Sequence, residues 1–151
     1  MTTPDPSRLG TMNLVGLTGD LVWRSEDAAL LKRAGLSHRQ FLTLYTIGSA
    51  TDLVTAAEVA RRLGRNDNTV GAIVHGLERQ GLVDSFASPR DGRGAYLRLT
   101  ESGKRILAAG RDVESDLAES LLSGLSDSEV DLLGRLLQKL KSRLAGSPPG
   151  K

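Results

Sequence analysis

Two short amphipathic segments separated by one glycine constrain the fold of this chain more than any other feature. Residues 55–80 read TAAEVARRLGRNDNTVGAIVHGLERQ. Val59 and Leu63 lie one helical turn apart in the first half, and the second half repeats apolar residues at helical spacing, at Val70, Ile73, Val74 and Leu77. Gly64 stands at the junction, where a turn often needs a positive φ. The pattern predicts helices at 55–63 and 66–80 that pack through their apolar faces, which is the helix-turn-helix arrangement.

Capping signals mark the starts of further helices. A hydroxyl residue followed three positions later by Glu or Gln forms a capping box, and this pattern occurs at Ser37–Gln40, Thr55–Glu58 and Ser126–Glu129. Asn66 and Thr100 are additional N-cap candidates. Together with apolar periodicity, these signals predict helices at 11–33, 37–49, 100–122 and 126–145. We expect the first eight or so residues and the terminal GSPPGK to be loose, because they hold few apolar groups.

A charged tip joins two segments of strand composition directly after the short helices. The segments are LVDSFAS (82–88) and AYLRL (95–99), and the tip contains Arg90, Asp91 and Arg93. Gly92 and Gly94 suit a turn, and Asp91 can pair with Arg93 to hold its shape. A helix-turn-helix followed by such a hairpin is a winged helix. The predicted fold class is mainly α with a small antiparallel β-wing, flanked by helices before and after it.

Composition excludes several classes of protein. The chain has 151 residues, 39% hydrophobic and 25% charged, which fits one globular domain. It has no cysteine, so disulfides and thiolate metal sites are excluded. No apolar run approaches the roughly 20 residues that span a membrane, and the N-terminus lacks a signal-peptide layout, so we expect a cytoplasmic protein.

The distribution of charge is more informative than the net charge of +2. Residues 53–105 hold nine Lys or Arg and six Asp or Glu, a net charge of +3. Residues 111–145 hold five Lys or Arg and seven Asp or Glu, a net charge of −2. The middle of the chain is therefore modestly basic, although ordinary solvated faces would give the same totals.

The outward face of the helix at 66–80 is polar and small, which suits a groove of DNA. Asn and Thr can hydrogen-bond base edges or phosphates, and small residues allow close approach. Arginine suits a narrow minor groove. A helical hairpin with a solvated face and a wing without a partner remain the alternatives. The candidate DNA-binding residues are Thr55, Arg65, Asn66, Asp67, Asn68, Thr69, Ala72, His75, Arg90, Asp91 and Arg93.

The order of elements and the stretch SPRDGRGAYLRLTESGKRIL (88–107) resemble the MarR (multiple-antibiotic-resistance regulator) family of winged-helix transcription factors. The family's wing typically reads Asp-x-Arg-Asp-Gly-Arg, followed by an alternating strand and Leu-Thr-x-x-Gly. The residues here that match it are Ser88, Arg90, Asp91, Gly92, Arg93, Leu99, Thr100 and Gly103. The segments 56–83 and LSHRQFLTLYTIG (36–48) resemble the family's helix-turn-helix and second helix, so the likeness covers about residues 11–145.

The resemblance implies a sequence-specific, dimeric regulator, a ligand-responsive repressor, that binds pseudo-palindromic double-stranded DNA. The helix at 66–80 would enter the major groove and the wing at 88–94 the minor groove, with the two recognition helices roughly 34 Å apart. The whole chain would form one domain, with residues 37–103 binding DNA and residues 11–36 and 104–145 forming the dimer. The dimer contacts expected on this basis are Leu14, Leu17, Leu133, Leu136, Leu137 and Leu140.

The apolar stripe of the last helix supports a dimer independently of the resemblance. Val130, Leu133, Leu136, Leu137, Leu140 and Leu144 follow helical spacing. This stripe exceeds what a monomer of this size needs, although leucines that close the monomer's own core are the alternative. Many relatives of the resembled family also bind small anionic aromatic molecules, and the candidate residues for such a ligand here are Trp23, Arg39 and Tyr45.

The recognition helix departs from the resembled family. The family usually has Ser or Thr at the cap and often Arg further along, whereas this chain has Asn66, Asp67, Gly71 and Ala72. Asp67 repels phosphates, and each of Gly71 and Gly76 costs about 1 kcal/mol relative to Ala in a helix interior. We therefore expect modest affinity or an unusual sequence preference, with much of the binding from the wing and from backbone amides at the helix N-terminus.

Other chemistries have little support in the sequence. His38 and His75 are the only histidines and lie in different predicted helices, so we expect no metal site and interpret both as surface or groove-facing. No Ser/His/Asp grouping has a supportive spacing, so we expect neither an enzyme nor a cofactor. Two alternative functions stay open: a winged-helix module for protein interaction or DNA architecture without operator specificity, and a ligand-binding protein that has lost its operator.

Overall fold

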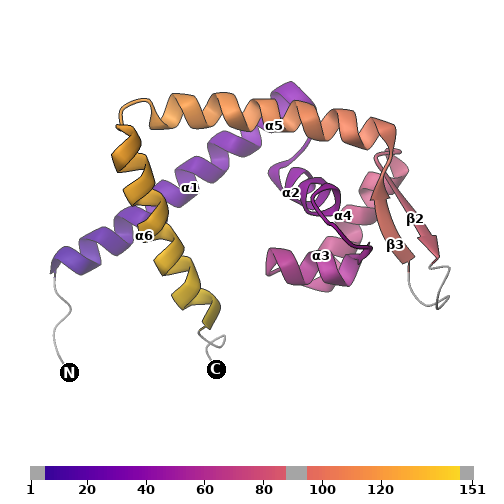
Figure 1. Ribbon diagram of the computed structural model, residues 1–151, viewed down its shortest axis with the longest axis horizontal. Coiled ribbons are helices and arrows are strands. Elements are labelled where there is room, and N and C mark those ends of the chain that lie inside the picture. Colours follow the sequence, from indigo (N-terminus) through magenta and orange to yellow (C-terminus); the bar gives the residue numbers. More distant parts are fainter. Residues whose placement is uncertain (1–5, 88–94, 147–151) are drawn as a thin grey trace. The chain divides into compact units, whose positions relative to one another are not determined.

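The computed structural model describes residues 6–87 and 95–146. The chain divides into two compact units, residues 1–114 and 115–151, and one long helix begins in the first unit and ends in the second. In chain order (Figure 1) the elements are α1 (Pro6–Ala34), α2 (His38–Gly48), β1 (Val54–Thr55), α3 (Ala56–Leu63), α4 (Asp67–Arg79), β2 (Val83–Ala87), β3 (Ala95–Leu99), α5 (Glu101–Leu122) and α6 (Asp127–Gly146). The predicted fold class, mainly α with a small antiparallel sheet, is confirmed.

Side-chain caps fix several of the helix starts. The Ser37 hydroxyl accepts from Gln40 N at 3.2 Å while the Gln40 side chain accepts from Ser37 N at 2.9 Å, so this capping box is confirmed. The box at the start of α6 is confirmed as well, because Ser126 N donates to Glu129 Oε2 at 2.8 Å and Ser126 Oγ accepts from Glu129 N at 3.4 Å.

Two details of the predicted helices are wrong. The Thr55 hydroxyl accepts from Glu58 N at 3.2 Å, but the Glu58 carboxylate binds Arg61 and Arg62 instead of returning to the cap. That box is therefore only half formed, because two guanidinium groups compete for the carboxylate. The first helix begins at Pro6 rather than residue 11, so the expectation of a loose N-terminus is wrong from residue 6 onward.

The sheet contains a third strand that the sequence did not predict. Its order is β1-β3-β2, and both pairs are antiparallel. Val83 opposes Leu99 and Ala87 opposes Ala95, which sets the register of the predicted hairpin. The added strand β1 is two residues long and pairs Val54 with Leu97. Two residues are too short to show a periodic pattern, which explains why the strand was missed.

The core is aliphatic and is built from the first unit. Leu30, Leu44, Val59, Val70 and Leu77 are almost fully buried, together with Phe41. In this unit α2 packs on α1, α3 and α4, while α4 contacts β2 (Figure 1). This packing holds the short helices α3 and α4 in a fixed relation to the sheet.

The start of α5 is locked to the turn before β2. The Thr100 hydroxyl donates to Gly81 O at 2.6 Å and accepts from Gly103 N at 3.0 Å. Gly103 lies so close to this turn that an added Cβ would collide with the carbonyl oxygen of Leu82. The Leu-Thr-x-x-Gly motif at 99–103 therefore has a structural role in joining α5 to the sheet.

Helices α1 and α6 leave large apolar side chains uncovered. On α1, Leu14 and Leu17 are 64% and 65% exposed, and the α6 leucines Leu133, Leu136, Leu137 and Leu140 are 39–49% exposed. None of these leucines belongs to the buried core of the first unit. Among the described residues, no helix is both long and apolar enough to cross a membrane.

Candidate nucleic-acid interface

The turn between α3 and α4 depends on a left-handed glycine. Gly64 has φ 60° and ψ 37°, and Arg65 N then donates to Ala60 O at 2.9 Å. A side chain at this position would be strained, because residues other than glycine rarely adopt a positive φ. Asn66 begins the next helix by accepting from Asn68 N at 2.9 Å. The predicted positive φ at Gly64 and the cap at Asn66 are both confirmed.

Helix α4 has a buried apolar face and an exposed polar face, as the sequence predicts. Val70, Val74 and Leu77 are at most 5% exposed. The opposite face carries the exposed residues Asn66, Asp67, Asn68, Thr69, Ala72 and His75. An added Cβ at Gly71 or Gly76 would meet no neighbouring atom within 4 Å, so neither glycine is required by packing.

The polar side chains of this face differ in whether they already form hydrogen bonds or ion pairs within the chain. Within the described residues, no hydrogen bond holds the side chains of Asn68 and Thr69, so both can bind a partner. His75 is exposed and lies 3.8 Å from Glu78. Thr55 is half-buried and its hydroxyl is used by the α3 cap, which leaves it less available than the others.

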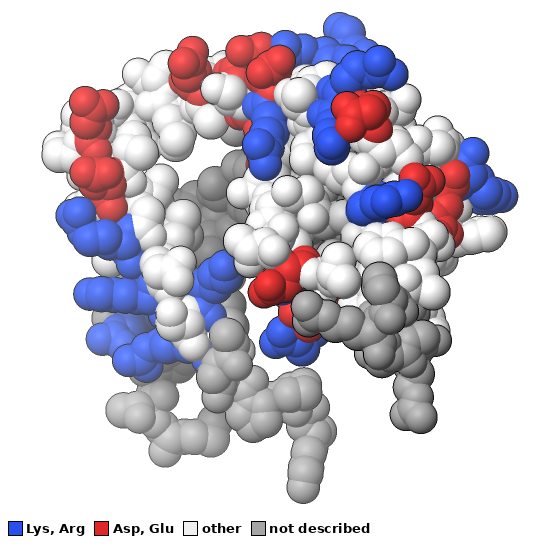
Figure 2. All heavy atoms as spheres, turned by 45° about the vertical axis from the view of Figure 1, so that its right-hand side comes forward, with Lys and Arg blue, Asp and Glu red and all other residues white. Residues whose placement is uncertain are grey.

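The electrostatics of the interface are mixed. Arg65 and Asp67 flank the α4 cap and are both exposed, so the partial positive charge of the helix N-terminus has an acid as well as a base beside it. Acidic and basic side chains both occur on the face that the space-filling view shows (Figure 2). Because Arg65 and Asp67 lie on either side of the cap, binding of a polyanion at this end of α4 would depend on local geometry.

The two strands that carry the wing are described, but its tip is not. Across the pair, Arg98 Nε lies 3.7 Å from Asp84 Oδ2, and its guanidinium carbon is 5.2 Å from the centre of the Phe86 ring. The predicted tip residues Arg90, Asp91 and Arg93 lie outside the described residues, as do Gly92 and Gly94.

The three candidate ligand residues do not form one group. The guanidinium carbons of Arg39 and Arg65 lie 6.0 and 5.7 Å from the centre of the Trp23 ring. Tyr45 instead packs beside Phe41, with ring centres 6.2 Å apart, and lies 5.1 Å from the Arg111 guanidinium. Arg111 also lines an open groove of about 1060 Å³ with Arg98 and Lys104.

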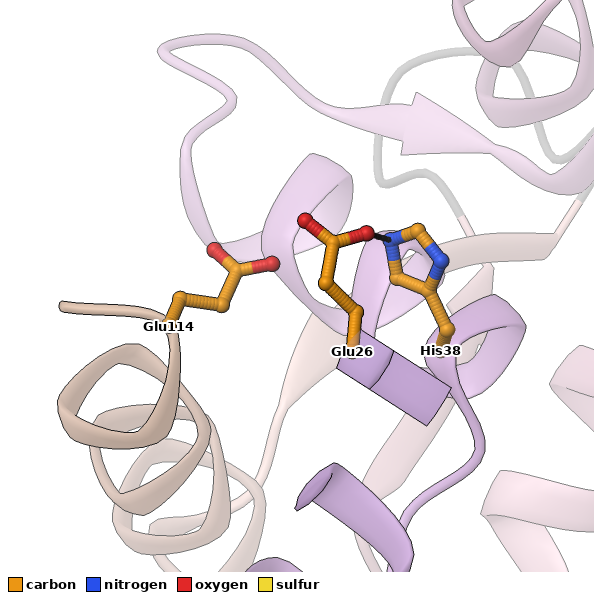
Figure 3. A group of neighbouring side chains, drawn as sticks. All are labelled: Glu26, His38 and Glu114. Atoms are coloured by element: carbon orange, nitrogen blue, oxygen red, sulfur yellow. Dashed lines mark ion pairs between the residues drawn. The ribbon is translucent and has the colours of Figure 1, made fainter. Parts of the chain in front are cut away.

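The structure also forms a cluster of polar side chains that the sequence did not predict. Glu26 of α1, His38 of α2 and Glu114 of α5 bring one ligand atom each to within 4.8 Å of one another (Figure 3). His38 is 7% exposed, so its interpretation as a surface or groove-facing histidine is wrong. Glu114 is distant in sequence from both Glu26 and His38, and only the packing of three helices brings the three residues together.

Several proteins of known identity are similar to this chain in sequence or in fold. The sequence pattern of the MarR family matches residues 34–94. Transcriptional repressor MprA of Escherichia coli is 30% identical over 116 residues, which cover 76% of this chain and 66% of that protein. The chain thus spans slightly less than two thirds of this curated relative.

Solved structures agree with that match. MepR of S. aureus in complex with DNA has a TM-score of 0.75 at 26% identity, and the match covers 87% of this chain and 94% of the MepR chain. CouR of Rhodococcus jostii bound to p-coumaroyl-CoA has a TM-score of 0.74 at 23% identity, and the match covers 91% of this chain and 93% of CouR. At this identity the similarity shows only that the two proteins share a fold. With its helix-turn-helix, β-pair and long flanking helices, this chain belongs to the MarR family.

Proposed function

We propose that this protein is a DNA-binding transcription regulator whose helix α4 enters the major groove. The observation that supports this most directly is the face of α4, where exposed Asn68 and Thr69 project from a helix whose other side is fixed in the core. Amide and hydroxyl groups presented on a rigid helix suit base-edge and phosphate recognition. The similarity to MprA, named as a repressor, favours repression over activation.

The regulator would act as a homodimer on a pseudo-palindromic site. Support comes from the exposed leucines of α1 and α6, which a second copy could cover. Residues 11–36 and 104–145 would supply the dimer contacts and residues 37–103 the DNA contacts. Recognition helices related by a two-fold axis would then enter successive major grooves roughly 34 Å apart.

Arg90 and Arg93 would add minor-groove contacts from the wing. These residues lie beyond the described part of the chain, so their role rests on the sequence motif. Their replacement by Ala should weaken binding to all sequences, because arginine in a narrow minor groove contributes mainly electrostatic attraction. Nanomolar binding by a double R90A/R93A variant would contradict this role.

A small anionic aromatic effector could bind beside Trp23. Two guanidinium groups, of Arg39 and Arg65, lie near this ring and could pair with a carboxylate. Trp23 is the only tryptophan of the chain, so its fluorescence reports on this position directly. Titration with hydroxybenzoates should change the emission, and Arg39→Gln should weaken the response; an unchanged spectrum would contradict the assignment.

Selection of genomic fragments with the purified protein tests the DNA-binding function. We expect enriched fragments that share a palindromic site, and binding that weakens steeply with salt because Lys and Arg displace counterions. The variant Asn68→Ala/Thr69→Ala should lose affinity for the selected site while keeping its thermal stability. Asp112→Asn on the exposed side of α5 serves as the matched control and should bind normally.

Two results would contradict the proposal. Equal affinity for selected and random duplexes would indicate an architectural DNA binder without operator specificity. No binding to any fragment at low salt would indicate a winged helix used for another purpose.

A further inference from the structure

The cluster of Glu26, His38 and Glu114 has the composition and geometry of a cation site. His38 Nε2 lies 3.4 Å from Glu26 Oε2, and one ligand atom from each of the three residues lies within 4.8 Å of the others. Figure 3 shows the two carboxyl groups side by side, with the imidazole ring next to Glu26. These residues come from three different helices, α1, α2 and α5, and all three residues lie in the first compact unit.

The charges of this cluster are not balanced by a basic side chain. In the part of the chain that the structure describes, neither Glu26 nor Glu114 forms an ion pair with Lys or Arg. Desolvation raises the pKa of Glu114, and the nearby Glu26 carboxylate raises it further. Two neighbouring carboxylates therefore repel one another here, and a bound cation would relieve that repulsion.

Hydrogen bonding does not account for the buried imidazole. The His38 side chain is 9% exposed, and its Nδ1 is buried without a hydrogen-bond partner among the described residues. Nε2 is the ring nitrogen that lies beside Glu26, so it is the nitrogen that would bind a metal ion, while Nδ1 would carry the proton (Figure 3). The separation of 3.4 Å between Nε2 and Glu26 is also longer than the usual 2.7–3.2 Å of an N–H···O bond.

That same separation fits two ligands of one metal ion. Ligand atoms bound tetrahedrally at about 2.0–2.2 Å lie about 3.3–3.6 Å apart. His38 Nε2 and Glu26 Oε2 already have this spacing. The ligand atoms of the three residues all lie within 4.8 Å of one another. Because Glu114 is only half-buried, its carboxylate could move closer to the other two ligands.

The surroundings also hold the histidine in place. Asp27 Oδ1 accepts from the backbone N–H of His38 at 2.7 Å, which fixes the first residue of α2. The Trp23 ring meets the imidazole edge-on, with the ring centres 4.3 Å apart. A fixed imidazole facing two carboxylates needs little reorganisation to bind a metal.

We propose that Glu26, His38 and Glu114 form a binding site for a divalent first-row transition metal such as Zn²⁺. The imidazole favours such an ion over Ca²⁺ or Mg²⁺, which prefer oxygen ligands. Three protein ligands leave at least one coordination position for water. The bound ion would join α1, α2 and α5, and the site is independent of whether the chain binds DNA.

Titration of the tag-free protein with Co²⁺ tests this site, because cobalt replaces zinc and its visible absorption reports imidazole and carboxylate ligation. We expect one Co²⁺ per chain, displaced by Zn²⁺, and a rise of the thermal midpoint with Zn²⁺ that a chelator reverses. His38→Gln should abolish the absorption. Glu26→Gln and Glu114→Gln should weaken binding at least about tenfold, the lower end of the loss seen for outer-shell partners.

Two matched variants control for non-specific binding. His75→Gln removes the only other histidine, and Glu119→Gln removes an exposed carboxylate from α5, where Glu114 also lies. Both should bind Co²⁺ like the wild type. Circular dichroism checks folding, and if His38→Gln does not fold, the two isosteric Glu→Gln variants still decide the result.

The proposal is overturned by any of three results. These are the absence of a cobalt spectrum, binding that Glu26→Gln and Glu114→Gln leave unchanged, and binding that His75→Gln removes.

Discussion

At the scale of single residues, the close approach of Gly103 to the turn before β2 makes this position intolerant of any side chain. An added Cβ would collide with the Leu82 carbonyl oxygen, which is backbone and cannot rotate away. We expect Gly103→Ala to destabilise the protein by about 1–3 kcal/mol, the usual cost of overpacking a buried site. Chemical denaturation followed by circular dichroism measures the change.

Gly71→Ala is the matched control for this substitution. Its Cβ would enter open space, and alanine favours a helix over glycine by about 1 kcal/mol. The control should therefore be more stable than the wild type. A Gly103→Ala variant that unfolds at the wild-type denaturant concentration would disprove the packing argument.

Glu58 should titrate at an unusually low pH. Hydrogen bonds from Arg61 and Arg62 lower the pKa of its carboxyl group from 4.5 to about 2. Because the folded pKa is depressed, the stabilisation by this group is present above about pH 4.5 and is lost as the pH falls towards 2. Carboxyl ¹³C NMR of the folded protein measures the titration.

Removal of either arginine should reverse the shift of Glu58 in part. Arg61→Gln should raise the pKa most, since Arg61 makes the largest contribution, and Arg62→Gln should raise it less. Lys104→Gln, which breaks a comparable exposed pair with Glu101, should leave Glu58 unchanged. A midpoint near 4.5 in the unaltered protein would show that these ion pairs do not form in solution.

At the scale of elements, the sequence predicted those features that depend on local signals. The caps at Ser37, Asn66 and Ser126 and the glycine turn at Gly64 were correct because each is fixed by residues within a few positions. Strand β1 was missed because only its pairing with β3 makes it a strand.

The candidate sites also divide into those that local sequence predicts and those that depend on tertiary packing. The exposed face of α4 follows from helical periodicity, so its residues could be named from the sequence. The Glu26–His38–Glu114 cluster could not be, because it depends on how α1, α2 and α5 pack. Likewise Trp23 and Arg39 come together as a pair, whereas Tyr45 of the same helix as Arg39 faces Arg111 instead.

The acidic first turn of α4 is expected to increase the stability of the helix while it lowers the affinity for DNA. Asp67 is exposed at the helix N-terminus, where an acid stabilises a helix by about 0.3–1 kcal/mol, but the same charge repels phosphates. Asp67→Asn should therefore lower stability slightly and tighten binding to the selected duplex by about two- to tenfold. Fluorescence anisotropy at two salt concentrations measures both the gain and its screening.

The gain from Asp67→Asn should shrink at high salt, since it comes from the removal of a like charge. Asp112→Asn, which removes an exposed acid from α5, should leave affinity unchanged at either salt concentration. Weaker binding by Asp67→Asn would mean that Asp67 accepts a hydrogen bond from a base rather than repelling the backbone.

At the scale of the whole molecule, α1 and α6 expose many large apolar side chains, which is energetically unfavourable in water. Leu14, Leu17 and Leu21 of α1 are each at least 60% exposed, and the leucines of the α6 stripe are exposed from Leu133 to Leu144. Apolar area gains about 25 cal/mol for each Å² removed from water, so a second copy that covers these leucines would be strongly favoured.

A double substitution in α6 tests the dimer directly. Leu136→Asp/Leu140→Asp places two charges in the proposed interface, where desolvation would be costly, so we expect a monomer at concentrations where the wild type is a dimer. Analytical ultracentrifugation measures the mass. The core of the first unit should stay folded, because neither leucine belongs to it, and circular dichroism checks this.

Leu53→Asp is the matched control, since Leu53 is 55% exposed in the segment between α2 and β1 and belongs to neither helix. It should remain dimeric. The monomeric α6 variant should also bind the palindromic duplex far more weakly, with its affinity falling towards that for a half-site, because the two recognition helices no longer act together. A folded double variant with the wild-type mass would show that α6 does not form the interface, and would leave the leucines of α1 to be tested alone.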